Sequence, residues 1–291
     1  MEQNTMQTTP FNNHLFIDSG AHGLYNEHLL RKGHKFGYSW YETKAFTDYI
    51  DRFAAFVKYN PAIKNFANVD VIFNPELTWK SQMYMEEVHG LKPIPVIHFG
   101  TDRKWLVKYL ERGYDYIALG GLGQEAQQSH YVAWADNMFE VICDTPGNLP
   151  CTKVHGFAMT SYHLMTRYPW WSVDSTTWLS IAMYGQIIIP PFKDGRWRYD
   201  IPFNIIRMSD EPSKVKKRTT HHIAKIVEKY VEEKGFKIGK NRVENDEIII
   251  VEDGVKNNTH IRSTLNAMYF VDFCNYMPEW PWPFYNQKKL I

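Results

Sequence analysis

Trp170-Trp171-Ser172-Val173-Asp174-Ser175-Thr176-Thr177-Trp178 is the stretch that organises the chain, because it joins a short apolar run to an amphipathic segment. The apolar run ends at Asp174, and the hydroxyl residues after it are of the types that cap helices. The pattern predicts a strand with Asp174 at its C-terminal tip, followed by a helix that Ser175 or Thr176 caps. Because the carboxyl ends of parallel strands often carry reactive side chains, Asp174 is a candidate catalytic residue.

The same order of apolar run, polar or glycine-rich tip and amphipathic segment repeats along the chain before this stretch. Strands are predicted over 15–17, 69–73, 93–100, 116–119, 153–159 and 171–174, and helices over 41–59, 78–89, 102–112, 131–142 and 162–168. Strands that alternate with helices favour a parallel sheet, and polar residues that follow strands are typical of a barrel active site. We therefore predict an α/β fold, a (β/α)8 TIM-like barrel, that uses residues 1–291 as a single domain.

The pattern changes after Trp178. Residues 186–208 predict a β-hairpin insertion with Asp194-Gly195 at its turn. A helix over 220–234, a strand over 247–251 and a helix over 261–276 follow, and residues 277–291 form a tail rich in Trp and Pro. The last two units of the barrel are therefore expected to be irregular.

The composition indicates a folded protein without a global attraction to polyanions. Hydrophobic residues make up 44% of the chain and aromatic residues 15%, and the formal net charge is +1. Nucleic-acid binding would therefore need local basic patches. The chain has two such patches, which a solvated surface would also explain: Arg196-Trp197-Arg198, and the run that contains Lys214, Lys216, Lys217 and Arg218.

Cysteine and histidine spacing predicts no metal site and no disulfide framework. Cys143, Cys151 and Cys274 are widely spaced and form no Cys-x-x-Cys pair. His221 and His222 are adjacent on a predicted helix and therefore point to different faces. The N-terminus lacks an apolar signal region, and no stretch approaches the length of a membrane span. We expect a soluble cytoplasmic protein without a cofactor.

Several strand-tip residues have two interpretations when taken singly. Asp18-Ser19-Gly20 follows the first predicted strand and fits either a functional loop or a tight turn before a helix. His98 could contact a ligand or could be a satisfied core histidine. Gly120 and Gly121 would let a ligand approach the backbone, although a tight turn alone would also need them.

Taken in order, the segments between Phe16 and Trp178 resemble the tRNA-guanine transglycosylase superfamily, and most closely its phage and bacterial DNA-modifying branch, the DpdA-type 7-deazaguanine DNA transglycosylases. Asp18-Ser19-Gly20 is similar to the family's Asp-Ser-Gly-Gly segment, and the run from Asp70 to Glu76 lies where the family has an apolar strand that ends in an acid. The resemblance extends to the tip motifs Val96-Ile97-His98-Phe99-Gly100, Leu119-Gly120-Gly121-Leu122 and Val173-Asp174.

The resemblance implies exchange of a base at C1′ of a nucleotide, with Asp174 as the nucleophile and Asp18 as the general acid/base. Gly120 and Gly121 would bind the base through backbone groups. Glu76, or Asn74, would contact its guanine-like edge. His98 takes the place of the family's base-reading Gln. The resemblance also places Ser19, Gly20 and Met159 at the base.

Three departures separate this chain from the tRNA enzymes. It lacks their cysteine-rich zinc subdomain, Ala21-His22-Gly23-Leu24-Tyr25 replaces their aromatic-Gln pair, and no Pro-Thr-Arg follows Asp174. We therefore predict a DNA-guanine transglycosylase that exchanges guanine in DNA for a 7-deazaguanine base such as preQ0. Either a homodimer or an accessory protein that opens the duplex would suit this function. The alternatives are exchange in tRNA and a barrel that binds nucleobases or nucleic acid without catalysis.

Overall fold

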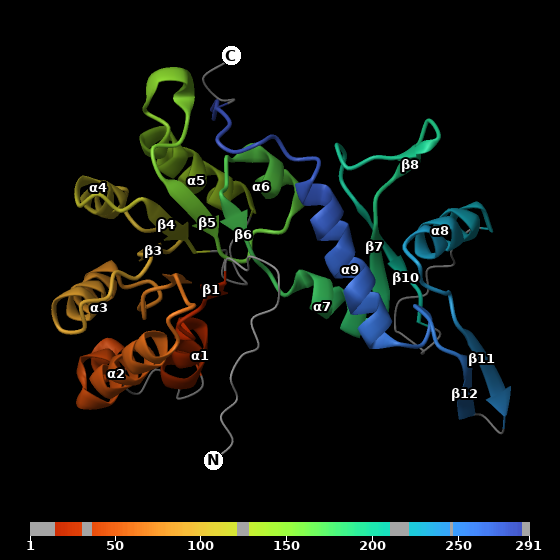
Figure 1. The fold of residues 1–291 in the computed structure, drawn as a ribbon, viewed down its shortest axis with the longest axis horizontal. Helices are drawn as coiled ribbons and strands as arrows, with labels where there is room; N and C mark the ends of the chain where they lie inside the picture. Colours follow the sequence, from red (N-terminus) through yellow and green to blue (C-terminus); the bar gives the residue numbers. More distant parts are fainter. Residues whose placement is uncertain (1–14, 31–36, 121–127, 210–220, 245–246, 287–291) are drawn as a thin grey trace. The chain divides into compact units, whose positions relative to one another are not determined.

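The computed structural model describes residues 15–30, 37–120, 128–209, 221–244 and 247–286 (Figure 1). The chain divides into two compact units. Unit 1 contains Met1–Phe157, Pro169–Ser172 and Pro283–Ile291, and unit 2 contains Ala158–Tyr168 and Val173–Trp282. Within the described ranges, no helix combines the length and the apolar character needed to cross a membrane.

Unit 1 is a mixed α/β structure whose parallel strands pair in chain order (Figure 1). Its strands are β1 (Phe16–Ile17), β2 (Asn65–Phe66), β3 (Val96–Ile97), β4 (Tyr116–Leu119) and β5 (Lys153–Gly156), and β6 (Ser172–Val173) ends at the unit boundary. β1 pairs with β2, and a parallel bridge joins Ala67 to Ile94. β3, β4 and β5 continue in parallel, with Val96 opposite Ala118 and Ala118 opposite His155. The predicted α/β class with parallel strands is therefore confirmed.

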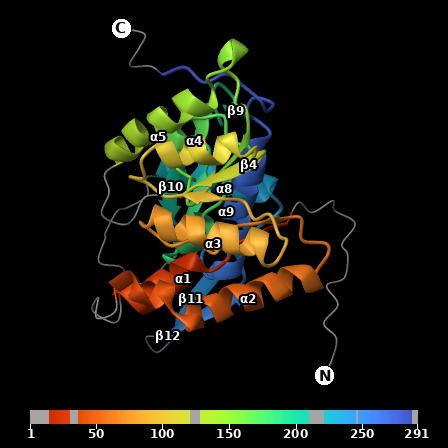
Figure 2. The same ribbon diagram turned by 90° about the vertical axis from the view of Figure 1, so that its left-hand side faces the viewer.

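Helices follow these strands because amphipathic segments separate the apolar runs. They are α1 (Ala21–Tyr25), α2 (Lys44–Tyr59), α3 (Pro75–Glu87), α4 (Lys104–Glu111) and α5 (Gln128–Ile142), with a π-helical segment at Asn26–Leu30 and 3-10 turns at Gly37–Glu42 and Pro146–Asn148. Figure 2 shows α5 and α4 above α3, and α3 above α2. β3 and β4 are covered on both faces, since consecutive residues of each strand are buried: Val96 and Ile97 on β3, and Ile117 and Ala118 on β4. Continuous burial explains why these strands read as unbroken apolar runs.

The sheet of unit 1 is strongly curled. In a flat sheet, β1 and β5 would lie roughly 19 Å apart, since neighbouring strands are about 4.8 Å apart. The ring of Phe16 on β1 instead stacks on the imidazole of His155 on β5, with centroids 4.2 Å apart and planes at 18°. Phe16 also packs on a cluster formed by Ala67, Ile94, Val96 and Ala118. On the same side of β5, Nδ1 of His155 lies 2.7 Å from Oγ of Ser172.

Unit 2 combines helices with antiparallel ribbons. Its elements are α6 (Tyr162–Arg167), α7 (Thr177–Met183), β7 (Gln186–Ile189), β8 (Phe192–Lys193), β9 (Arg196–Trp197), β10 (Asn204–Arg207), α8 (His221–Glu233), β11 (Lys240–Glu244), β12 (Glu247–Glu252) and α9 (Thr259–Cys274). β7 pairs with β10, β8 with β9 and β11 with β12, all antiparallel. Asn266 of α9 accepts a hydrogen bond from the backbone N–H of Ile188 at 2.7 Å and donates one to the carbonyl of Trp178, which fixes α9 against β7 and α7.

The predicted hairpin is confirmed within unit 2. Asp194 and Gly195 join β8 to β9, and both have positive φ values of 52° and 75°. Two consecutive positive φ values are what a two-residue hairpin turn requires, and Asp-Gly is among the sequences that adopt them most readily.

The predicted strand over 69–73 is wrong. β2 lies earlier, at Asn65–Phe66, and the next residues form no ladder although Val69 and Val71 are fully buried. Side chains of α3 satisfy their backbone instead. Oγ1 of Thr78 accepts a hydrogen bond from the N–H of Val71 at 2.9 Å and donates one to its carbonyl at 3.0 Å, and Ser81 donates to the carbonyl of Val69 at 2.6 Å. The apolar alternation therefore reflects burial beneath a helix rather than strand pairing.

Candidate functional site

The loop after β1 presents Asp18 on a rigid turn. Gly20 has a φ of +79°, and its N–H lies 3.4 Å from Oδ1 of Asp18. Oη of Tyr49, from α2, donates a hydrogen bond to the carbonyl of Ser19 at 2.7 Å. A Cβ at position 20 would lie 2.8 Å from that hydroxyl, so the turn needs glycine for both space and backbone conformation. Asp18 is exposed, whereas the Ser19 side chain is buried.

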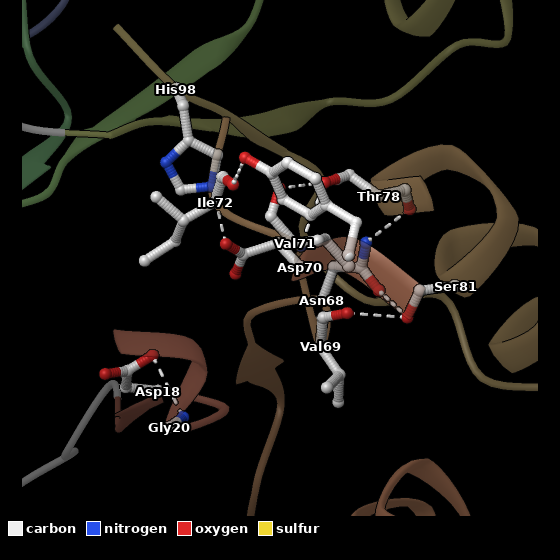
Figure 3. A network of polar contacts seen from close by, with 11 residues as sticks. Asp18, Gly20, Asn68, Val69, Asp70, Val71, Ile72, Thr78, Ser81 and His98 are labelled. Carbon is white, nitrogen blue, oxygen red and sulfur yellow. Dashed lines mark hydrogen bonds and ion pairs between the residues drawn. The ribbon is translucent and has the colours of Figure 1, made fainter. Parts of the chain in front are cut away.

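Asp70 and His98 form a buried pair beside the tip of β3 (Figure 3). Nε2 of His98 lies 2.6 Å from Oδ2 of Asp70, and their side chains are 14% and 5% exposed. This contact engages one ring nitrogen of His98, and the other, Nδ1, lies on the side of Gly120. Asp70 was not among the site residues predicted from the sequence. The signal for it was an acid inside the apolar run Val69-Asp70-Val71-Ile72, where a charge needs a partner.

Gly120, directly after β4, makes room for the imidazole of His98. A Cβ at this position would lie 2.7 Å from Nδ1 and 3.3 Å from Cα of His98. The N–H of Gly120 donates to the carbonyl of Ile97 at 2.7 Å, which draws the tips of β3 and β4 together. Gly120 and His98 are thus two predicted site residues that the fold brings into contact. Gly121 lies outside the described residues.

Asn74 and Glu76 lie on the turn that begins α3. Oδ1 of Asn74 accepts a hydrogen bond from the N–H of Leu77 at 3.0 Å, so Asn74 is the N-cap of the helix. Glu76 belongs to the first helical turn and is exposed. A network of Asn68, Thr78 and Ser81 fixes the segment that leads to this turn (Figure 3). The Asn74 carbonyl oxygen is thus already engaged, and Glu76 presents a solvated carboxylate.

Asp174 lies directly after β6, in unit 2, whereas Asp18 belongs to unit 1. Oδ1 of Asp174 accepts a hydrogen bond from the N–H of Ala158 at 3.0 Å, and its carbonyl accepts one from Met159 at 3.0 Å. Ala158 has a φ of +58°, which is rare for a residue with a Cβ. The Asp174 side chain is exposed, while that of Met159 is fully buried. Of the two predicted caps, Ser175 supplies the hydroxyl, since its Oγ accepts from the N–H of Thr177 at 2.9 Å.

The predicted basic segment Arg196-Trp197-Arg198 borders an open pocket of about 480 Å³ within unit 2. The pocket is lined by Phe192, Gly195, Arg196, Trp197, Tyr199, Lys229, Glu233, Lys234, Asp272, Asn275 and Tyr276. Trp197 is fixed there, because its Nε1 donates to Oε2 of Glu233 at 2.5 Å and its ring packs on Tyr230. Aromatic and cationic side chains from three elements thus meet in one pocket.

The two arginines of this segment differ in their pairing. Arg198 forms two hydrogen bonds with Asp200, of which that from Nε is 2.6 Å long, and these bonds lower the pKa of Asp200 to about 2. Arg196 is exposed and lines the pocket. An anion would therefore meet Arg196 more readily than Arg198. Lys214, Lys216, Lys217 and Arg218 lie outside the described residues.

Comparisons with family models, curated proteins and solved structures gave no match. Asp18 and Asp174 are exposed carboxylates on loops that hydrogen bonds hold, and such groups act as nucleophiles or acid–base catalysts. In the part of the chain that the structure describes, no cluster of three or more His, Cys, Asp or Glu residues could hold a metal ion.

Proposed function

We propose that the protein is a DNA-guanine transglycosylase that exchanges guanine in DNA for a preQ0-like 7-deazaguanine. The observation that carries the proposal is a set of polar groups that follow parallel strands, namely Asp18 after β1, His98 after β3 and Gly120 after β4, together with the Asn74–Glu76 turn at the start of α3. One row of strand tips can hold a planar base by its edge and place an acid beside it. The curl that brings Phe16 onto His155 supports a sheet that closes into a (β/α)8 barrel.

The reaction runs as two displacements at one carbon atom. A carboxylate oxygen of Asp174 attacks C1′ of the deoxyribose, the bond from C1′ to the guanine nitrogen breaks, and guanine leaves with a proton from Asp18. The incoming 7-deazaguanine then gives its ring N–H proton to Asp18, and its nitrogen displaces Asp174 from C1′. Two inversions retain the configuration at C1′, as in retaining glycosidases. The enzyme returns to its initial state without a cofactor.

Groups on unit 1 suit recognition of the base. The N–H and amino groups on the guanine edge are donors, and the Glu76 carboxylate is an acceptor. Nδ1 of His98 and the backbone at Gly120 offer further polar contacts, and the Asp70 carboxylate keeps the imidazole from rotating. The same edge is present in guanine and in 7-deazaguanine, so one set of groups serves both halves of the exchange.

The pocket of unit 2 suits the polymer. A target base inside a duplex must be flipped out of the stack, or taken from single-stranded DNA, before C1′ can be attacked. The ring of Trp197 and the charges of Arg196 and Lys229 fit a strand opened in this way, because stacking and phosphate contacts need no particular base sequence. Such a strand could come from an accessory protein that opens the duplex or from a second subunit.

The test is incorporation of radiolabelled preQ0 into duplex DNA, single-stranded DNA and tRNA by the full chain. We expect incorporation into DNA, and Asp174→Asn should reduce it at least about 1,000-fold, since nucleophile removal costs several orders of magnitude. Asp253→Asn is the matched control, an exposed acid elsewhere in unit 2. Incorporation into tRNA alone would move the proposal to the tRNA reaction.

A denaturing gel separates catalysis from binding. The first displacement leaves Asp174 esterified to the deoxyribose, so wild-type protein should form a species that migrates with DNA, and Asp174→Asn should not. A protein that binds DNA without forming this species or exchanging base would be a binding barrel, and the catalytic assignment would be wrong.

A further inference from the structure

Phe73 occupies a backbone position that does not suit phenylalanine. It is the third residue of a tight turn that a hydrogen bond from the N–H of Asn74 to the carbonyl of Val71 closes at 2.9 Å. Its φ is +60°, a value that turns normally give to glycine or asparagine. For a bulky residue such a conformation is an outlier, and outliers of this kind cluster at ligand-binding sites.

Burial does not explain the residue either. The side chain of Phe73 is 48% exposed, although the flanking Val71 is fully buried. A core phenylalanine would offset an unfavourable backbone by removing its ring from water. Here the backbone is unfavourable and the residue is still exposed, so neither local conformation nor burial accounts for a phenylalanine at this position.

The turn beneath Phe73 is held from several sides. Oη of Tyr38 donates to the carbonyl of Ile72 at 3.1 Å, and Thr78 holds both backbone groups of Val71 (Figure 3). Asn74 is fixed by its cap on α3. The ring therefore stands on a rigid support.

The neighbours of the ring are aromatic and lie at an angle to it. The ring of Tyr25 meets Phe73 edge to face, with centroids 5.9 Å apart and planes at 81°. The imidazole of His98 lies 6.3 Å away at 59°. None of these contacts is a parallel stack, so a face of the Phe73 ring is not used in stacking within the part of the chain that the structure describes. Asn74 and Glu76, which offer polar groups to the edge of a base, follow directly in the chain.

We propose that Phe73 is a stacking platform for the bicyclic base, guanine on its way out and 7-deazaguanine on its way in. The inference rests on the proposed function and adds to it the residue that takes the face of the base. A phenyl ring suits both ligands, because guanine and 7-deazaguanine differ at one ring atom and present similar π faces. Stacking on a fixed ring also orients the base for contacts in its own plane, from the adjacent turn and from His98.

The experiment measures binding of preQ0 and of guanine to the full chain by titration calorimetry, together with thermal unfolding. Phe73→Tyr keeps a six-membered aromatic ring and should bind preQ0 within about twofold of wild type. Phe73→Asn should weaken binding about tenfold to a hundredfold, the range for loss of one base–aromatic stack. Its melting temperature should equal or exceed that of wild type, because asparagine tolerates positive φ.

Phe56→Asn is the matched control. Phe56 is also 48% exposed, but it lies in α2 with ordinary helical neighbours. This variant should bind preQ0 as wild type does. It should melt slightly lower, because asparagine is a slightly poorer helix former than phenylalanine and little packing is lost at an exposed site. A lower melting temperature in Phe73→Asn than in Phe56→Asn would assign Phe73 a structural role and overturn the platform.

The remaining outcomes separate this inference from the proposed function. If wild type binds preQ0 and Phe73→Asn binds it equally well, the platform is wrong and exchange is unaffected. If Phe73→Asn loses binding but wild type never exchanges a base in DNA or tRNA, the platform stands and the transglycosylase proposal falls. Absence of preQ0 and guanine binding by wild type would overturn both.

Discussion

Asp70 contacts the imidazole of His98, with 2.6 Å between Oδ2 and Nε2, and the Asp70 side chain is only 5% exposed. The same unit contains a second pair of this kind, Asp51 with His89 at 2.8 Å, in which the carboxylate is 43% exposed. The two pairs share their chemistry and differ in burial, so they form a natural comparison. Burial should decide how much each carboxylate contributes to the free energy of unfolding.

Asp70→Asn should lower the free energy of unfolding by about 1–1.5 kcal/mol, because a buried hydrogen bond to a charged group, which contributes about 1.5–3 kcal/mol, is replaced with a neutral one that contributes about 0.5–1.5 kcal/mol. Asp51→Asn should cost less than about 1 kcal/mol, as exposed ion pairs do. Urea unfolding of both variants checks the difference. Equal losses would mean that the Asp70 contact is no stronger than a surface pair.

Gly120→Ala should destabilise the protein by about 1–3 kcal/mol, because the new methyl group would overlap the ring and the Cα of His98. Gly23→Ala is the control, since nothing lies within 4 Å of its added Cβ and it sits inside α1. That variant should be stabilising by about 0.5–1 kcal/mol, the helical advantage of alanine over glycine. Melting temperatures that move in the same direction would contradict the steric argument.

Thr78→Val should cost about 1–3 kcal/mol. The side chains have the same shape, but valine leaves the N–H of Val71 without its acceptor, whereas the Val71 carbonyl keeps the bond from the N–H of Asn74, and an unsatisfied buried group costs about 1–3 kcal/mol. Thr47→Val in α2 is the comparison, because its hydroxyl makes only one long contact of 3.5 Å. Chemical denaturation should separate the two variants clearly, and a Thr78→Val loss below that of Thr47→Val would refute the role assigned to this hydroxyl.

Glu86 should make the protein more sensitive to acid. Burial alone would raise the pKa of this carboxyl, but hydrogen bonds from Tyr114, Gln82 and Arg112 outweigh it and lower the pKa. A lowered folded-state pKa stabilises the fold above the unfolded value of about 4.3, and that stability is lost as the pH falls through the folded pKa.

Replacing Glu86 with Gln should therefore reduce stability at pH 7 and flatten its decline below about pH 4.3. Urea midpoints at pH 7, 4 and 3 provide the measurement, with Glu87→Gln as the exposed neighbour for control. If the variant and wild type lose stability in parallel, Glu86 is not the group that titrates.

The buried parallel strands could be predicted from the sequence because burial on both faces requires a continuous run of apolar residues. The predicted strand over 116–119 is β4 itself, and the turn at Asp194-Gly195 joins β8 to β9. β11 was not predicted, since a two-stranded ribbon that faces solvent imposes no apolar alternation on Lys240–Glu244. The strand over 69–73 was predicted wrongly because the valines of this segment are buried beneath α3 without pairing to another strand.

At the candidate site, sequence patterns located residues better than they explained them. Gly120 was predicted to open the backbone to a ligand, and the structure shows that it accommodates the His98 ring. Asn74 was predicted to contact the base, and its carbonyl oxygen caps α3. Asp70, Tyr49 and Phe73 were not singled out, because their positions follow from contacts and torsion angles that no local pattern encodes.

The stack of Phe16 on His155 joins two residues that lie 139 positions apart in the chain. During synthesis the N-terminal strand therefore emerges from the ribosome long before its aromatic partner, and loop closure of this length is slow. At a typical elongation rate of about 5–20 residues per second, Phe16 waits roughly 7 to 28 seconds for His155. Until then its ring can pack only on the earlier cluster of Ala67, Ile94, Val96 and Ala118, so the sheet of unit 1 reaches its final curl only after β5 has been synthesised.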